Sequence, residues 1–161
     1  MPNWCMNNLT VRHDDPAMLQ KFVDAYNSNE TCQSFIPRPE SINNSDAFAD
    51  DGWYKWNVNN WGTKWDFGKG EYDDPATIED GVVSITFDTA WSPPTQFYDY
   101  LVGLGYDVDA TYFEPGMGFC GVYYNGDDEY VDYGHDKSDI PSRIWDEYAL
   151  DDFFEMMEEE T

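Results

Sequence analysis

The chain has 161 residues, a length that suits one domain and can bury a core without disulfides. Its formal net charge is −25, from 33 acidic and 8 basic side chains, and it contains 7 Trp, 12 Tyr and 10 Phe. This aromatic content excludes a disordered acidic chain. The sequence has no basic leader and no run of about 18 apolar residues, which disfavours secretion and a membrane span. Three cysteines without metal or redox spacing (Cys5, Cys32 and Cys120) favour reduced thiols, so we expect a soluble cytoplasmic protein.

The first elements are a strand and a helix. Residues 5–12 alternate between apolar and polar side chains, which predicts a strand. Asp14-Asp15-Pro16 has the residue types of a helix start, with an acidic cap and proline in the first turn. An apolar stripe follows at helical spacing from Leu19 to Tyr26. We therefore expect a helix directly after the first strand.

A tryptophan-rich stretch, WYKWNVNNWGTKWD, occupies residues 53–66. Its first part has no strand period and predicts a short helix that Gly62 ends. Residues 63–67 alternate and predict a strand. Because the chain has few leucines, the indoles are expected to fill the core. The alternative is a small-ligand pocket of stacked rings with convergent polar groups. Its candidate residues are Trp61, Lys64, Trp65, Asp66 and Trp91.

The second half of the chain again contains predicted strands and helices. Residues 83–91 alternate clearly and predict a strand, and Ser92-Pro93-Pro94 predicts a capped helix start. Gly105 ends that helix, and residues 108–112 form a further strand. Residues 119–124 and 129–133 flank Asn125-Gly126, the signature of a type I′ hairpin. Residues 144–160 predict one acidic amphipathic helix, with Trp145, Ala149, Phe153 and Met157 at steps of four.

This order of elements predicts an α+β fold. The core order is βαββαβ, which is typical of a ferredoxin-like antiparallel sheet with two helices on one face. An acidic C-terminal hairpin and helix are added to it. We expect residues 1–122 to form the ferredoxin-like domain. Residues 123–161 are expected to form the hairpin and helix, either packed on the domain or extending from it.

Several phrases of the sequence point to a known family. They are MPNWCMNNLTV, FIPRPE, WYKWNVNNWGTKWD, FDTAWSPP and YFEPGMGFCG, and together they span residues 1 to 122. In this set and order the chain resembles the YubB-type ferredoxin-like family, whose members of unknown function occur on bacteriophages and conjugative plasmids. The resemblance implies the fold and a mobile-element origin. It implies no catalytic residues.

Nothing in the sequence predicts an enzyme. The two histidines, His13 and His135, lie in no recognisable nucleophile or metal motif. The acidic stretch at 125–139 could attract a divalent cation but lacks the spacing of an EF-hand loop. We therefore expect no catalytic residue, no cofactor and no dedicated metal site.

The acidic residues suggest a binding role. Direct nucleic-acid binding needs Lys and Arg, and residues 81–161 contain only Lys137 and Arg143 against 19 acids. Clustered carboxylates could instead imitate the phosphates of DNA. Our leading hypothesis is a phage or mobile-element protein that inhibits a host restriction or CRISPR factor by occupying its basic nucleic-acid groove. The alternatives are a ligand-binding or enzymatic module at the Trp-rich site, and a homodimer through the tail. The expected partner-binding residues are Asp127, Asp128, Glu129, Asp132, Asp146, Glu147, Asp151, Asp152 and Glu155.

Overall fold

A five-stranded antiparallel sheet forms the centre of the computed structural model, which describes residues 3–134 and 136–159. The strands are β1 (Trp4–Arg12), β2 (Val82–Ala90), β3 (Asp107–Glu114), β4 (Phe119–Tyr124) and β5 (Asp127–Asp132). Their order across the sheet is β2-β1-β3-β4-β5. The α+β class and the antiparallel sheet are confirmed.

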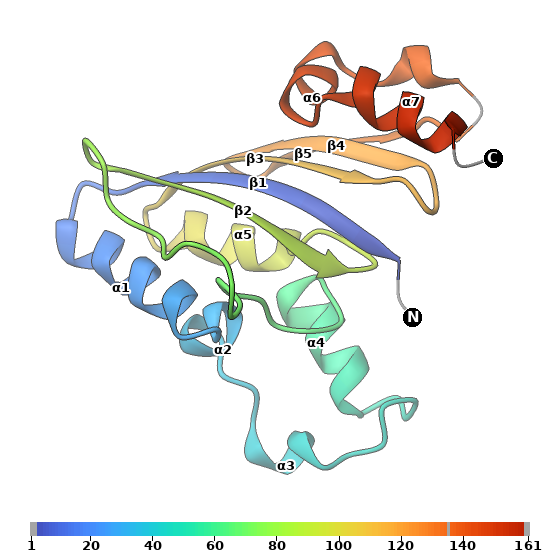
Figure 1. Cartoon of the computed structure of the whole chain (residues 1–161). Coiled ribbons are helices and arrows are strands. Elements are labelled where there is room, and N and C mark those ends of the chain that lie inside the picture. The colour runs from blue at the N-terminus through green and yellow to red at the C-terminus, as the bar shows by residue number, and fades with distance from the viewer. Residues whose placement is uncertain (1–2, 135, 160–161) are drawn as a thin grey trace.

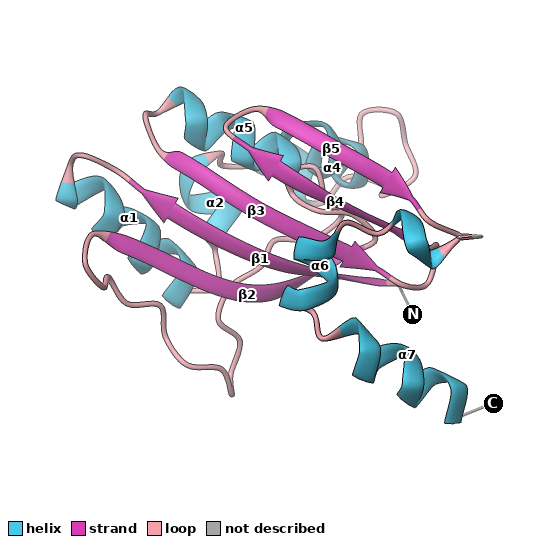
Figure 2. Ribbon diagram, turned by 90° about the horizontal axis from the view of Figure 1, so that it is seen from above, coloured by secondary structure: helices cyan, strands magenta, loops and turns pink. Residues whose placement is uncertain are grey.

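Helices cover the two faces of the sheet unequally (Figure 1). On one face lie α1 (Pro16–Asn27), α2 (Thr31–Phe35), α4 (Trp53–Trp61) and α5 (Thr95–Gly103), and α3 (Glu40–Asn43) lies beyond them. The opposite face carries α6 (Ser142–Glu147) and α7 (Leu150–Glu159), preceded by the 3-10 turn Lys137–Asp139. Seen from above, α6 lies over the sheet, and part of β1 and β2 stays uncovered (Figure 2). We call α6 and α7 together the acidic layer.

Two apolar clusters hold the layers together. Alternate residues of β1 are at most 1% exposed and face the α1–α5 side, where Leu9 and Val11 join the larger cluster. The smaller cluster lies under the acidic layer, with Phe113 of β3 packed against Ile144 and Leu150. The sheet is therefore buried on both faces of β3 and β4, and the C-terminal segment packs on it.

The strand predicted at residues 63–67 is wrong, because this segment makes its hydrogen bonds to other loops and helices. Thr63 donates its hydroxyl to the Ala90 carbonyl over 3.0 Å, and the Phe67 carbonyl accepts from Thr31. The segment thus bridges β2 and α2 without a strand partner. With this strand absent, four helices (α1 to α4) separate β1 from β2, and α5 then leads to β3, β4 and β5, which is not the βαββαβ order.

Two predicted helix boundaries also need correction. Helix α5 begins at Thr95 and not after a Ser92 cap, because the Ser92 hydroxyl donates to the Gly62 carbonyl over 2.6 Å. The single helix predicted over 144–160 is broken into α6 and α7. Ala149 lies between them and turns the chain. Its φ of 49° is in the left-handed region, which a residue with a side chain adopts only at a cost in free energy.

Other predicted elements are confirmed. Helix α4 ends at Gly62, whose φ of 92° is the left-handed conformation of a helix end. Asn125 and Gly126 have φ of 46° and 100° and join β4 to β5 as the type I′ hairpin. No helix in the described residues is long and apolar enough to cross a membrane.

The aromatic core is confirmed for Phe and Tyr and wrong for most tryptophans. Among the largest fully buried side chains are Tyr98, Tyr123 and Phe97. Trp61 is the one tryptophan in the buried core of the described residues. Indoles therefore line the surface near the helical layer more than they fill the interior.

Candidate functional site: a tryptophan-rich surface and an acidic layer

The aromatic cluster forms around the ammonium group of Lys64. Its Nζ lies 4.7 Å from the ring centre of Trp65, 4.6 Å from that of Trp91 and 5.5 Å from that of Tyr54. The ring centre of Trp65 also lies 6.1 Å from that of Trp4, and the indoles of Trp4, Trp65 and Trp91 are 40–45% exposed. Cations are attracted to aromatic faces, so the chain's own lysine occupies this cage. Three of the five predicted pocket residues, Lys64, Trp65 and Trp91, are thus brought together.

Trp61 and Asp66, the other two predicted pocket residues, serve the scaffold. Trp61 is 2% exposed and donates its indole N–H to the Ile36 carbonyl over 2.9 Å. The Asp66 carboxylate accepts the backbone N–H groups of Cys32, Gln33 and Phe67 over 2.7, 2.9 and 2.8 Å. Burial raises the pKa of Asp66, and these hydrogen bonds oppose that rise. Asp66 therefore fastens the first turn of α2 to the loop.

A polar hollow of about 460 Å³ lies beside these two residues. It is lined in part by Gln33, Arg38, Asn43, Asn57, Trp61 and Trp65, and we call it the Arg38 pocket. The guanidinium carbon of Arg38 lies 6.0 Å from the ring centre of Trp53 and 5.8 Å from that of Trp61.

The sequence reasoning missed the polar residues of the Arg38 pocket. They lie on α2, α3, α4 and the intervening loop, so no single segment contains the pattern. One local signal was available. Arg38 stands between two prolines in FIPRPE, and prolines fix an extended backbone that presents the residue between them.

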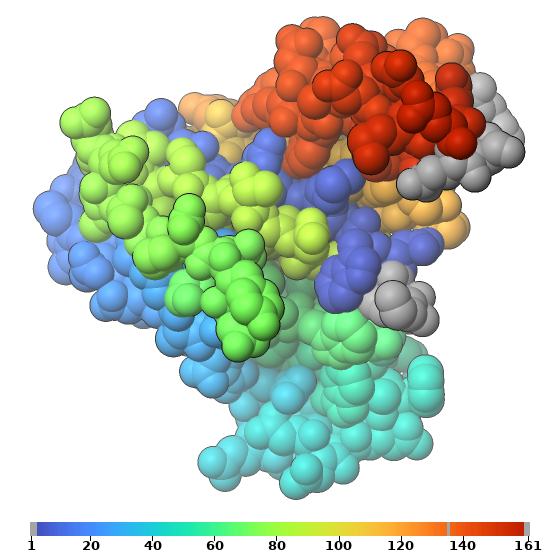
Figure 3. Space-filling view, viewed as in Figure 1, coloured from blue at the N-terminus to red at the C-terminus, as the bar shows by residue number. Residues whose placement is uncertain are grey.

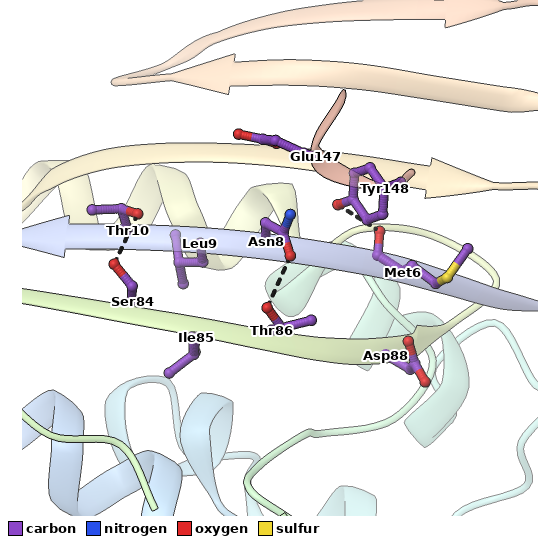
Figure 4. Close-up of a pocket in the computed structure, with 10 residues that line it drawn as sticks. All are labelled: Met6, Asn8, Leu9, Thr10, Ser84, Ile85, Thr86, Asp88, Glu147 and Tyr148. Carbon is purple, nitrogen blue, oxygen red and sulfur yellow. Dashed lines mark hydrogen bonds between the residues drawn. The ribbon is translucent and has the colours of Figure 1, made fainter. Parts of the chain in front are cut away.

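A second recess lies on the uncovered face of β1 and β2 (Figure 4). This groove has a volume of about 480 Å³. On its floor the Thr86 hydroxyl donates to Asn8 over 2.9 Å, and the hydroxyls of Thr10 and Ser84 lie 3.2 Å apart. Asp88 lies at its margin, where burial and the charge of Asp73 raise its pKa. The groove has both polar and apolar side chains in its lining, and it borders the acidic layer through Glu147.

The predicted partner-binding acids of the hairpin do not share one surface. Successive side chains of a strand point to opposite faces. Asp128 pairs with Tyr123 of the larger cluster, so Asp128 and Asp132 face the helical side. Asp127 and Glu129 face the acidic layer. Burial raises the pKa of Asp128, which also accepts the Tyr112 hydroxyl over 2.7 Å.

Some predicted partner-binding acids of α6 and α7 form hydrogen bonds within the protein, and others are exposed. Glu147 accepts from Arg143 over 3.1 Å and from the Thr111 hydroxyl over 2.5 Å. Asp151 accepts the Trp145 indole N–H over 2.8 Å. Asp146, Asp152 and Glu155 are exposed. The space-filling view shows the C-terminal segment as a separate layer on the body (Figure 3). The candidate interaction surface consists of the acids of α6 and α7 together with Asp127 and Glu129, which lie on the face of the sheet that carries this layer.

The cysteines are buried, and the described histidine is hydrogen-bonded on both ring nitrogens. Cys5, Cys32 and Cys120 are buried and unpaired, and burial raises the pKa of the Cys120 thiol to about 11. His13 accepts the Asp15 N–H on one ring nitrogen and lies 2.9 Å from the Leu104 carbonyl on the other. His135 lies outside the described residues. Within those residues, no group of three or more His, Cys, Asp or Glu could hold a metal ion.

Comparison with known proteins adds little. No family model matches the chain, and no curated protein matches it significantly. A solved structure described as the protein api92 from Yersinia pseudotuberculosis, of the family DUF1281, is similar at 19% sequence identity and a TM-score of 0.45. The match covers 65% of this chain and 40% of that chain. A likeness of this size establishes neither a family nor a function.

Proposed function

We propose that this chain is a non-enzymatic phage or mobile-element protein that acts in the bacterial cytoplasm. It binds a host defence factor of the restriction or CRISPR type and blocks the factor's basic nucleic-acid groove with its acidic layer. The resemblance of residues 1–122 to the YubB-type family supports the mobile-element origin. It also supports the proposal that the fold is related to the ferredoxin-like fold. The charge of the acidic layer carries the inhibitory role.

The observation that carries the proposal is the absence of an available positive charge in this layer. The acidic layer and the 3-10 turn that precedes it, residues 136–159, contain nine acids and two bases, Lys137 and Arg143. Arg143 is paired with Asp109 and Glu147 over 2.9 and 3.1 Å, and the Lys137 ammonium lies 4.1 Å from the ring centre of Phe154. Both cations are engaged within the protein, so the layer presents carboxylates to a partner.

The charge spacing of α7 supports imitation of DNA. The helix carries five acids in ten residues, which at about 1.5 Å per residue is roughly one charge per 3 Å. A single DNA strand carries one phosphate per about 3.4 Å. The break at Ala149 shortens the continuous helix that the sequence suggested, but α7 alone keeps this density.

The test is inhibition of DNA cleavage by a panel of purified restriction and CRISPR nucleases. One variant replaces three exposed acids of α7 (Asp152→Asn, Glu155→Gln and Glu159→Gln). The matched control removes the same charge from the other side of the molecule (Asp14→Asn, Glu40→Gln and Asp51→Asn). We expect the protein to inhibit a nuclease, competing DNA or higher salt to relieve the inhibition, and only the α7 variant to lose it.

Three outcomes would refute the proposal. They are no inhibition of any nuclease, equal loss in both variants, and a nuclease that still holds DNA at full strength while the protein is bound. Equal loss would mean that net charge, and not the acidic layer, produces the effect.

The alternative function is a ligand-binding or enzymatic module at the Trp-rich surface. The polar Arg38 pocket next to the exposed indole of Trp65 favours it. A bound small molecule in contact with Trp65 would support this alternative. A homodimer would instead use the exposed Met156 and Met157 of α7, and sedimentation with and without α7 would detect it.

A further inference from the structure

The Arg38 pocket has a fixed arrangement of hydrogen-bond donors. An arginine side chain only donates. The Nε group of Arg38 donates to Asn43 Oδ1 over 2.6 Å, and Nη1 donates to Asn57 Oδ1 over 3.1 Å. The backbone N–H of Arg38 donates to Gln33 Oε1 over 3.0 Å. All three amides must therefore turn their oxygen atoms toward Arg38.

This orientation leaves the pocket with donors to spare. The amide N–H₂ of Asn57 is used by the Lys64 carbonyl over 2.7 Å. The Nη2 group of Arg38, the Nε2 group of Gln33 and the Nδ2 group of Asn43 have no acceptor among the residues that the structure describes. Each is free to donate to water or to a ligand, and a carboxylate or phosphate oxygen is the strongest partner for a guanidinium group.

The pocket is built to hold the guanidinium group in place. Trp53 and Trp61 flank it, and Asn57, which is 1% exposed, anchors one edge. A preorganised group loses little conformational entropy when a ligand binds. The volume of about 460 Å³ lies within the range of small-molecule sites.

The charges around the pocket disfavour a ligand with several negative charges. Asp66 and Glu30 also line it. The oxygens of Asp66 already accept three backbone N–H groups, and Glu30 is exposed. The two carboxylates beside one guanidinium group repel a polyanion such as a polyphosphate more strongly than a monoanion. The half-exposed indole of Trp65 offers a face for an apolar or aromatic ligand body.

We propose that the Arg38 pocket binds a small organic acid through one oxyanion, which accepts from Arg38, Gln33 and Asn43 while its apolar part lies against Trp65. This inference rests on the alternative ligand-binding function and is independent of the acidic layer.

The test uses calorimetric titration of the full chain with benzoate, and with benzamide as the neutral analogue of the same shape. The diagnostic variant is Asn43→Asp, which keeps the oxygen that Arg38 Nε needs but replaces the spare donor with a negative charge. Asn44→Asp makes the same chemical change at the next residue, whose side chain is exposed. Thermal unfolding checks that both variants remain folded.

We expect benzoate to bind at least about ten-fold more tightly than benzamide, and Asn43→Asp to weaken benzoate by about ten-fold or more. Asn44→Asp should change it by less than about two-fold. If benzamide binds as well as benzoate, or the two variants act equally, the oxyanion assignment is wrong while ligand binding stands. If neither compound binds and a wider set of aromatic fragments also fails, the inference and the ligand-binding alternative both fall.

Discussion

Removal of the Asp66 carboxylate should destabilise the protein strongly. In Asp66→Ala the N–H groups of Cys32 and Gln33 lose their acceptor at the first turn of α2. A hydrogen bond to a charged group contributes about 1.5–3 kcal/mol. Two such bonds give about 3–6 kcal/mol. Burial of the Asp66 carboxylate itself costs free energy, as its raised pKa shows, and the substitution removes this cost. We therefore expect the free energy of unfolding to fall by about 3 kcal/mol.

The assay is urea unfolding followed by circular dichroism at neutral pH. Asp66→Asn should cost less than Asp66→Ala, because the amide oxygen still accepts one or two of the N–H groups. Asp74→Ala is the control for removing one negative charge, since Asp74 is exposed. For a domain of this length, 3 kcal/mol corresponds to a fall of roughly 6–12 °C in Tm. A loss below about 1 kcal/mol in Asp66→Ala, relative to the control, would show that Asp66 does not fasten α2.

Three further predictions concern stability. The Tyr98 hydroxyl is buried without a partner in the described part of the chain. Tyr98→Phe should therefore raise the free energy of unfolding by about 1 kcal/mol, and a destabilised variant in urea unfolding would point to a partner. Ala149 has a left-handed backbone with φ of 49°. Ala149→Gly should therefore raise Tm by a few degrees, equivalent to about 1 kcal/mol, and an unchanged Tm would argue against strain there. Burial raises the pKa of Asp66, Asp88 and Asp128 in the folded state. Their contribution to stability is fully present below the unfolded value of about 3.9 and is lost as pH rises through the raised folded values. Repulsion within a chain of net charge −25 acts in the same direction. The free energy of unfolding should thus fall as the pH rises above the unfolded value of about 3.9, and a rise of the free energy of unfolding there would contradict the assigned directions.

Sequence periodicity predicted the elements that depend on local pattern. The alternation at residues 83–91 and the Asn125-Gly126 turn were read correctly because both signals lie within a few residues. Residues 63–67 alternate as well, yet they form a loop. The Phe67 carbonyl accepts from α2 and the Thr63 hydroxyl donates to β2, and alternation carries no information about where such partners lie.

The candidate sites were likewise predictable in part, where the signal lay within one segment of the chain. The tryptophans indicated the aromatic surface, and two of the five predicted pocket residues, Trp65 and Trp91, lie around a third, Lys64. The donors of the Arg38 pocket come from separate helices and a loop, so their convergence was not readable from spacing. The hairpin acids were predicted to act together, but the pleat of β5 sends Asp128 and Asp127 to opposite faces.

Composition alone determined that this protein is strongly acidic and builds its core from rings, because charge and side-chain volume are properties of the residues themselves. Local periodicity determined most strands and helices, since backbone hydrogen bonds within an element follow a fixed period. Tertiary structure alone decided that the tail breaks at Ala149 and covers the sheet. It also decided which carboxylates are free to meet a partner and which amides turn toward Arg38. Those outcomes depend on contacts between segments far apart in the chain, and no local pattern encodes them.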